Sequence, residues 1–201
     1  MQITLHRDLA RHAREFISYL KQFQYEKTST GLYFPRARVF AHGEYEHDVN
    51  GQDPCVDPNL LVDQGLLHML NVEFGATSKV SSWYIALFAN NIAPAANWTA
   101  ANFSATAGEI TSGTEGYSET TRQLFVPASA ASNEINNTAS KAAFSIVTAS
   151  SLNVYGAALL TSSVKGDTAG TLASATRFST ARVLNNGDTF NCGYRVQLSS
   201  T

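Results

Sequence analysis

Residues 189–199, TFNCGYRVQLS, alternate between apolar and polar side chains along their whole length. Successive side chains of a strand point to opposite faces of a sheet, so this alternation predicts a β-strand with one buried face. The predicted buried face carries five apolar residues and the other face none: Phe190, Cys192, Tyr194, Val196 and Leu198. The sequence therefore favours a fold that contains an extended sheet with a core on one side.

Several shorter strand-like stretches precede this one. WYIALF (residues 83–88) is apolar at odd and even positions alike, which predicts a strand buried on both faces at the centre of the fold. Asn186-Gly187-Asp188 is a strong turn signal between two strands. Further strands are expected within residues 117–126, 142–149, 152–160 and 170–179. Six or seven strands separated by turn signals predict a mainly β protein, with an antiparallel β-sandwich or jelly roll over residues 76–201.

The composition changes near Gly75. All five histidines and ten of the sixteen acidic residues lie before this position, whereas Ala, Ser, Thr and Asn dominate after it. We therefore expect two parts: an N-terminal helical and extended arm over residues 1–75, and the β-sandwich domain over residues 76–201.

Two helices are expected in the arm. The first covers residues 6–24, where apolar residues recur at spacings of three and four and basic residues lie elsewhere. Its apolar stripe is Leu9, Ala13, Phe16, Leu20 and Phe23, and its basic residues are Arg7, Arg11, Arg14 and Lys21. This helix would either dock on a partner or pack on its own domain, because periodicity does not separate the two cases.

The second helix has a predicted start and end. Asp57 would be its N-cap, Pro58 its first helical residue, and Gly75 its C-terminal cap. The apolar stripe of this helix consists of Val62, Leu66, Met69 and Leu70.

Charge and composition restrict the class of protein. Charged residues make up 15% of the chain and hydrophobic residues 44%, against roughly 25% charged in an ordinary globular protein. A surface made polar by Ser, Thr, Asn and Gly is common in β-rich, assembled proteins. The net charge of −2 does not favour a nucleic-acid partner, and no apolar run approaches the roughly 20 residues of a membrane span.

The N-terminus lacks the apolar stretch of a secretory signal. We expect a protein that is synthesised in a cytoplasm, where Cys55 and Cys192 stay free thiols rather than forming a disulfide.

Residues 41–57, AHGEYEHDVNGQDPCVD, concentrate two histidines, five carboxylates and a cysteine. His42, Glu44, His47 and Asp48 are the candidates for a metal site, because imidazole and carboxylate groups bind zinc and other transition metals. However, the two histidines are five residues apart, not four as in a helical zinc motif, and DVNGQD lacks the glycine position of an EF-hand. We expect a solvated loop with dispersed charges, and no metal or other cofactor.

No motif of a nucleophilic enzyme or of a phosphate-binding loop is present in the sequence. Glu109, Glu115 and Glu119 flank a glycine-rich loop and allow a pair of glycoside-cleaving carboxylates, but surface carboxylates that keep a loop soluble explain them better. We therefore expect no catalytic residues and a protein that is not an enzyme.

Four stretches of the second half carry a resemblance. They are SSWYIALFANN, YSETTRQLFVPA, FSIVTASSLNVYGAALLTSSVKGDTAGTLASATRFS and VLNNGDTFNCGYRVQL. Their order resembles that in small virion structural proteins of tailed bacteriophages: a Trp-Tyr strand, a Tyr-…-Arg strand, a Gly-Ala-…-Lys-Gly step and a final Asn-Gly-Asp-Thr hairpin. The resemblance covers residues 76–201, and the first 75 residues match no family.

This resemblance implies a capsid decoration (cement) protein that binds and stabilises the assembled head. It would be made in the host bacterial cytoplasm and act on the capsid surface of the virion. Its partners would be the major capsid protein or other virion subunits, without nucleic acid or membrane. A homo-oligomer is expected, with a trimer favoured, and the N-terminal arm would lie across neighbouring subunits.

Two alternatives stay open. The first is a tail, neck or fibre-base component with a similar sandwich. The second is a carbohydrate-binding virion module, for which Trp83, Trp98 and Tyr117 would be the sugar-stacking candidates.

Overall fold

The computed structural model describes residues 13–14, 17, 25–27, 29–35 and 39–200. The chain divides into two compact units, Met1–Phe40 with Ser199–Thr201, and Ala41–Leu198. We describe each unit by itself.

The smaller unit contains a β-hairpin. Its strands are β1 (Tyr25–Lys27) and β2 (Tyr33–Pro35), which pair antiparallel. Residues 13, 14 and 17 are helical. The remainder of the helix predicted over residues 6–24 lies outside the described residues.

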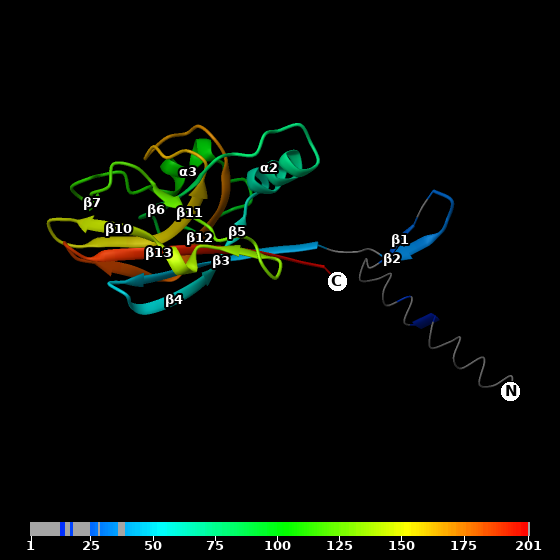
Figure 1. Ribbon diagram of the computed structural model, residues 1–201, viewed down its shortest axis with the longest axis horizontal. Coiled ribbons are helices and arrows are strands. Elements are labelled where there is room, and N and C mark those ends of the chain that lie inside the picture. Colours follow the sequence, from blue (N-terminus) through cyan, green and yellow to red (C-terminus); the bar gives the residue numbers. More distant parts are fainter. Residues whose placement is uncertain (1–12, 15–16, 18–24, 28, 36–38, 201) are drawn as a thin grey trace. The chain divides into compact units, whose positions relative to one another are not determined.

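The larger unit consists of two antiparallel sheets that pack face to face (Figure 1). The first sheet has the order β4-β3-β13-β10-β7, with β9 paired to β13, and the second has the order β5-β12-β11-β6-β8. The strands of the first sheet are β3 (Val39–Val49), β4 (Gln52–Pro58), β7 (Gly116–Tyr117), β9 (Glu134–Asn136), β10 (Ala142–Val147) and β13 (Thr189–Ser200). Those of the second are β5 (Leu60–Leu61), β6 (Trp83–Phe88), β8 (Gln123–Phe125), β11 (Leu152–Leu160) and β12 (Leu172–Leu184). The predicted mainly β sandwich is confirmed.

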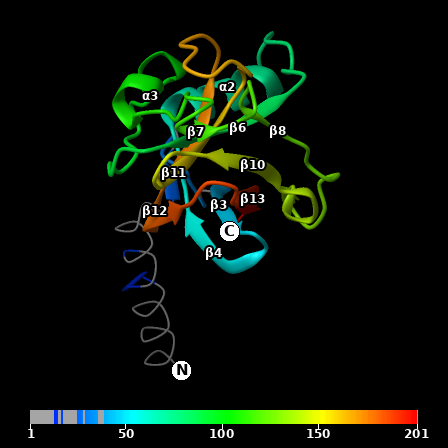
Figure 2. The same cartoon turned by 90° about the vertical axis from the view of Figure 1, so that its left-hand side faces the viewer.

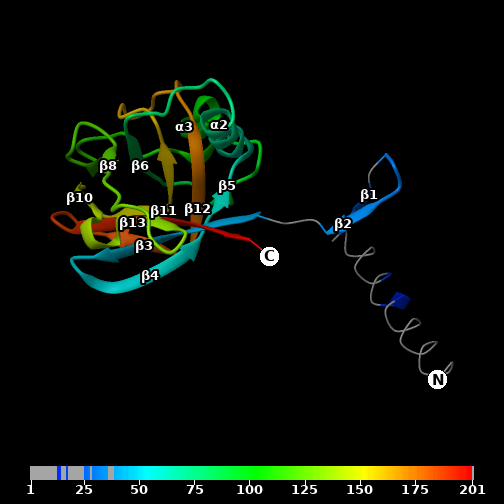
Figure 3. The ribbon, with the colours of Figure 1, turned by 45° about the vertical axis from the view of Figure 1, so that its right-hand side comes forward.

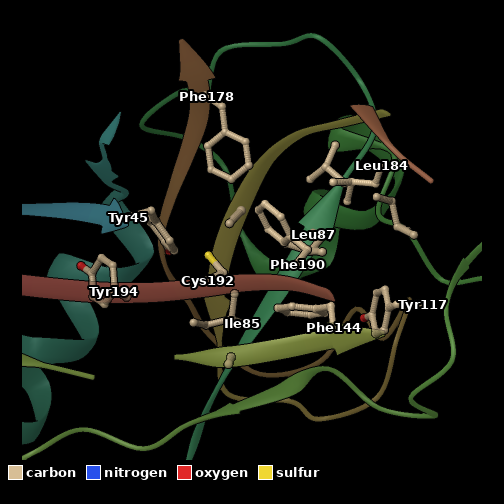
Figure 4. Close-up of a cluster of buried hydrophobic side chains, with 14 of the residues drawn as sticks. Tyr45, Ile85, Leu87, Tyr117, Phe144, Phe178, Leu184, Phe190, Cys192 and Tyr194 are labelled. Atoms are coloured by element: carbon tan, nitrogen blue, oxygen red, sulfur yellow. The ribbon is translucent and has the colours of Figure 1, made fainter. Parts of the chain in front are cut away.

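The main core lies between the two sheets (Figure 4). β13 contributes Phe190, Cys192 and Tyr194 to it and Val196 packs against it half-buried, as its alternating sequence predicts, whereas Leu198, which the alternation also predicts to be buried, is exposed. The opposite sheet contributes Ile85 and Leu87 of β6. Burial raises the pKa of the Cys192 thiol, and this thiol is free, as is that of Cys55 on β4.

A second, smaller core covers the outer face of the five-stranded sheet. Ala86 and Phe88 of β6 point into it and meet Trp98 and the short helix α3 (Ala100–Ala107), so β6 is buried on both faces as predicted. The helices α2 (Asp63–Glu73) and α3 both lie on this side of the molecule, away from β3, β4 and β13 (Figures 2 and 3).

Residues 41–57 form a β-hairpin, not the solvated loop expected from the sequence. β3 and β4 pair antiparallel around a turn at Asn50 and Gly51, both of which have positive φ. β3 lies between β4 and β13 in the first sheet. The larger unit therefore begins at Ala41, and residues 41–75, which the change in composition assigns to the arm, supply strands and a helix to the sandwich unit.

The second helix begins later than predicted. Asp57 and Pro58 are the last residues of β4, and α2 starts at Asp63 with Val62 as its N-cap. Asp57 stays in the strand because its carboxylate accepts hydrogen bonds from β12 and β3 rather than from a helix N-terminus. The helix ends one residue before the predicted cap: Phe74, not Gly75, is the C-cap.

The turn at Asn186-Gly187 is present but does not make a hairpin. It connects β12 to β13, which belong to different sheets, and Gly187 adopts a φ of 87° in it. The Asp188 carboxylate accepts a hydrogen bond from the backbone N–H of Asn185 and closes the turn. A turn signal of this kind marks a reversal of the chain, whichever sheet the next strand joins.

Candidate functional site

The four metal candidates do not converge. His42, Glu44 and Asp48 occupy even-numbered positions of β3, and His47 occupies an odd-numbered one. The side chain of His47 therefore points to the opposite face of the strand from the other three. Arg195 binds the Glu44 carboxylate, and the Lys141 ammonium lies 2.9 Å from that of Asp48. In the described parts of the chain, no group of three or more His, Cys, Asp or Glu side chains is arranged to hold a metal.

His47 belongs to a buried polar network between the sheets. Arg182 Nε donates to His47 Nδ1 at 3.0 Å, so Nε2 carries the proton and donates to Asp57 Oδ2 at 2.9 Å. The ring stacks on Phe178 with 3.8 Å between centroids, and Asp57 Oδ1 accepts from the Ser179 backbone N–H. Both ring nitrogens are engaged, which leaves neither as a general base.

Opposing effects set the charge states in this network. Burial lowers the pKa of His47, and the hydrogen bond to Asp57 only partly offsets this shift. Burial alone would raise the pKa of Asp57, but hydrogen bonds from His47 and Ser179 outweigh it and hold this pKa below its ordinary value. The pair is therefore a neutral imidazole hydrogen-bonded to a carboxylate, which joins β3 and β4 to β12.

Glu109 forms a buried ion pair with Arg122. Arg122 donates through Nε and Nη2 to the two carboxylate oxygens of Glu109, at 2.7 and 2.8 Å, and neither side chain is exposed. Arg122 also donates to the carbonyl oxygens of Ser162 and Asp167, and the Gly166 N–H donates to Glu109. The two side chains thus fasten the loop between β11 and β12 to the body of the sandwich.

The other two glutamates accept hydrogen bonds from backbone groups and a hydroxyl. Glu115 accepts from the Thr148 hydroxyl and the Ala149 N–H, and Glu119 accepts from the Ser145 N–H. These contacts fasten the segment that carries Glu115 and Glu119 to β10 and to the residues that follow it.

Two of the three sugar-stacking candidates are inaccessible. Trp98 is 4% exposed in the second core, and Tyr117 is fully buried in the first. Trp83 is half-buried, and His68 packs edge-on against it. The structure does not present these aromatic rings together on a surface that could bind a saccharide.

The inward face of α2 is polar. Gln64 Oε1 accepts hydrogen bonds from the Ala100 N–H at 2.9 Å and the Leu172 N–H at 2.8 Å, while Nε2 donates to the Gly170 carbonyl oxygen. At Gly65, a Cβ atom would lie 2.3 Å from the carbonyl oxygen of Ala173, so only glycine lets the helix approach β12 this closely. These contacts fix the position of α2 on the sandwich.

The outward face of α2 is apolar, and we call Leu66, Leu67, Leu70 and Phe74 its outer face. Phe74 is 85% exposed, and Leu67 and Leu70 are 59% and 58% exposed. Their spacing places them on one side of the helix, opposite Gly65 and His68. Of the stripe predicted from the sequence, only Val62 is buried, while Leu66, Met69 and Leu70 are exposed.

The outer face of α2 is the candidate functional site of the described chain. Monomeric soluble proteins rarely expose several large apolar side chains side by side, and such patches mark interaction surfaces. Asp63 and Glu73 lie at the two ends of the helix, and no Lys or Arg occurs between them. The site therefore combines an apolar centre with an acidic border.

One shallow depression of about 290 Å³ lies beside β5, between β12 and the loop after β6. Its walls are largely Pro, Ala and Leu, and its only charged side chain, Arg177, donates to the Asn91 side chain. It offers no cluster of reactive groups.

Among the described residues, no helix combines the length and apolar character required to cross a membrane. No protein-family model matches the chain, and no curated protein is significantly similar to it.

Proposed function

We propose that this protein is a non-enzymatic structural subunit of a tailed-bacteriophage virion, and specifically a capsid decoration (cement) protein that braces the assembled head. The observation that carries the proposal is the outer face of α2, an apolar surface displayed on a rigid β-sandwich. A subunit that acts as part of an assembly needs such a surface. The resemblance of residues 76–201 to virion structural proteins favours a phage particle as that assembly.

The anchoring of α2 supports this role. Gln64 and Gly65 hold the helix against β12 and α3, so the outer face is in place before a partner arrives. A preorganised surface avoids the free-energy cost of ordering a loop on binding. On a symmetric shell, contacts of this kind are repeated at many positions, so each one can be weak while the sum is strong.

The charged side chains support a structural role as well. Both ring nitrogens of His47 are occupied, Glu109 is neutralised by Arg122, and Glu115 and Glu119 accept hydrogen bonds from neighbouring loops. Each of these groups stabilises the sandwich, and none is left aimed at an open cleft.

The test is the number of copies per purified virion, measured by quantitative mass spectrometry against the major capsid protein. A decoration protein is expected at a lattice-sized ratio, such as one to one. A handful of copies per particle would replace this proposal with a neck or tail component, and absence from the particle would overturn the structural role altogether.

A matched pair of variants tests whether the outer face of α2 mediates assembly. In virions carrying Leu70→Ser/Phe74→Ser, we expect the copy number to fall at least tenfold. Leu124→Ser, which changes an exposed leucine of β8, is expected to leave it unchanged. Equal copy numbers for both variants would contradict the assignment of the outer face of α2 to assembly.

A further inference from the structure

We infer that the outer face of α2 binds the N-terminal segment of a second copy, residues 6–24, and that this exchange builds the oligomer. The inference rests on the proposed function, because it names the partner of the assembly surface assigned there. It does not depend on which virion part the oligomer joins.

The charges of α2 disfavour pairing of two α2 helices. Asp63 and Glu73 lie at opposite ends of the helix, and no basic residue lies between them. An antiparallel pair would place Asp63 of one copy beside Glu73 of the other, and a parallel pair would place like residues together. Like charges at such distances oppose association, so a segment that joins an apolar stripe to a net positive charge fits this face better than a second α2 does.

Residues 6–24 have this chemistry. Their sequence predicts an amphipathic helix whose stripe includes Leu9, Phe16 and Leu20. The segment contains four basic residues and two acidic ones, a net charge of +2, against −2 for Asp63–Glu73 with its two acidic residues and no basic one. The two segments are complementary in polarity and in net charge, with Arg7 and Arg11 on the side of the predicted helix away from its apolar stripe.

The predicted helix is long enough to cover the outer face of α2. At about 1.5 Å per residue, the outer face spans about 12 Å from Leu66 to Phe74, and the stripe from residue 9 to residue 23 would span about 21 Å as a helix. Both stripes carry apolar side chains three and four residues apart, the spacing at which the ridges of one helix pack into the grooves of another.

The arrangement favours a closed ring. The donated segment and the accepting helix are different parts of the chain, so the contact is heterologous, and a heterologous contact closes into a ring when the rotation allows it. Every copy then donates one segment and accepts one, which covers every outer face. A stable interface needs about 800 Å² per partner, more than one helix face provides, so the neighbouring sandwiches must add contacts of their own.

The test is the mass of the full-length protein in solution, measured by sedimentation equilibrium over a range of concentrations. Wild type and Leu124→Ser are expected to form the same oligomer. Leu70→Ser/Phe74→Ser is expected to weaken association at least tenfold while its thermal unfolding midpoint stays within a few degrees of wild type. A monomeric wild type, or a variant that associates as wild type does, would overturn the inference.

Charge reversal tests the named occupant. Arg7→Glu/Arg11→Glu and Asp63→Lys/Glu73→Lys should each weaken self-association, because each gives the segment and α2 net charges of the same sign. Mixing the two variants should restore association, since the basic segment of one then meets the acidic helix of the other. If mixing restores nothing, another surface covers α2. A lattice-sized copy number in virions would leave the proposed function standing even then.

Discussion

Two buried polar side chains, His47 and Arg122, connect parts of the sandwich that are not joined by hydrogen bonds between paired strands. His47 links the hairpin β3–β4 to β12 in the other sheet, and Arg122 links Glu109 to the loop that follows β11. Breaking such a buried network costs more free energy than forming it gains, because the partner that remains is left unpaired. Both networks therefore specify one arrangement of the chain more strongly than they stabilise it.

The His47 network predicts a stability that depends on pH. The folded-state pKa of His47 lies below the unfolded value of about 6.5, because the ring is buried. As the pH falls below about 6.5, the unfolded chain therefore binds a proton that the native chain excludes, and the free energy of unfolding decreases. The slope from this residue is at most about 1.4 kcal/mol per pH unit.

Urea unfolding between about pH 7 and pH 5 measures this slope. His47→Gln keeps an amide donor and acceptor at the site but does not titrate, so its free energy of unfolding should vary less with pH in this window. His42→Gln, at an exposed position of the same strand, serves as the control and should retain the wild-type slope. An unchanged slope in His47→Gln would show that other groups set the pH dependence.

The neighbouring strands β13 and β3 show what the sequence could and could not predict. The inward side chains of β13 include Phe190, Cys192 and Tyr194, so its period is evident. The inward residues of β3 are Gly43, Tyr45 and His47, of which only one reads as apolar, so the same period is hidden. Arg182, the partner that donates a hydrogen bond to His47, is distant from it in sequence. A local sequence pattern therefore does not show that His47 points inward.

α2 was predictable as a helix but not in its orientation. Amphipathic patterning places the apolar stripe toward the core, whereas here the polar Gln64 faces inward and Leu67 outward. The inward face is decided by hydrogen bonds to the backbone of α3 and β12 and by the close approach at Gly65. For this reason the sequence does not reveal the candidate site: an apolar stripe that faces solvent has the same spacing of residues as one that faces the core.

The inverted helix predicts mutational effects opposite to those of ordinary patterning. Gln64→Leu should lower the free energy of unfolding by about 2 kcal/mol, because it leaves the N–H groups of Ala100 and Leu172 without their acceptor. In the monomer, Leu67→Gln should change it by less than about 0.5 kcal/mol, because this side chain is exposed within one chain. Urea unfolding of both variants at one protein concentration, too low for self-association, gives the comparison. A larger loss in Leu67→Gln than in Gln64→Leu would mean that the outer face is covered within one chain.

Composition and contacts divide the whole chain at different places. The change in composition near Gly75 reflects where acidic and histidine residues are used, whereas the compact unit begins at Ala41 because β3 lies between β4 and β13. Composition describes surface chemistry, and a strand that pairs with the last strand of the chain is a long-range property. The sandwich was therefore predictable as a class, but not the inclusion of residues 41–75 in it.

Two fragments decide between these boundaries. Residues 41–201 retain all the strands of both sheets from Ala41 onward and should unfold cooperatively, with a midpoint within a few degrees of the full chain. Residues 76–201 lack β3, β4 and β5, which leaves one side of β13 unpaired and removes Tyr45 and Val62 from the two cores. Loss of a buried aromatic side chain alone costs about 3–5 kcal/mol, a large part of the roughly 5–15 kcal/mol that stabilises a domain. We therefore expect no cooperative transition for residues 76–201 in circular dichroism on heating. A sharp transition near that of the full chain would instead show that residues 41–75 only decorate a sandwich complete without them.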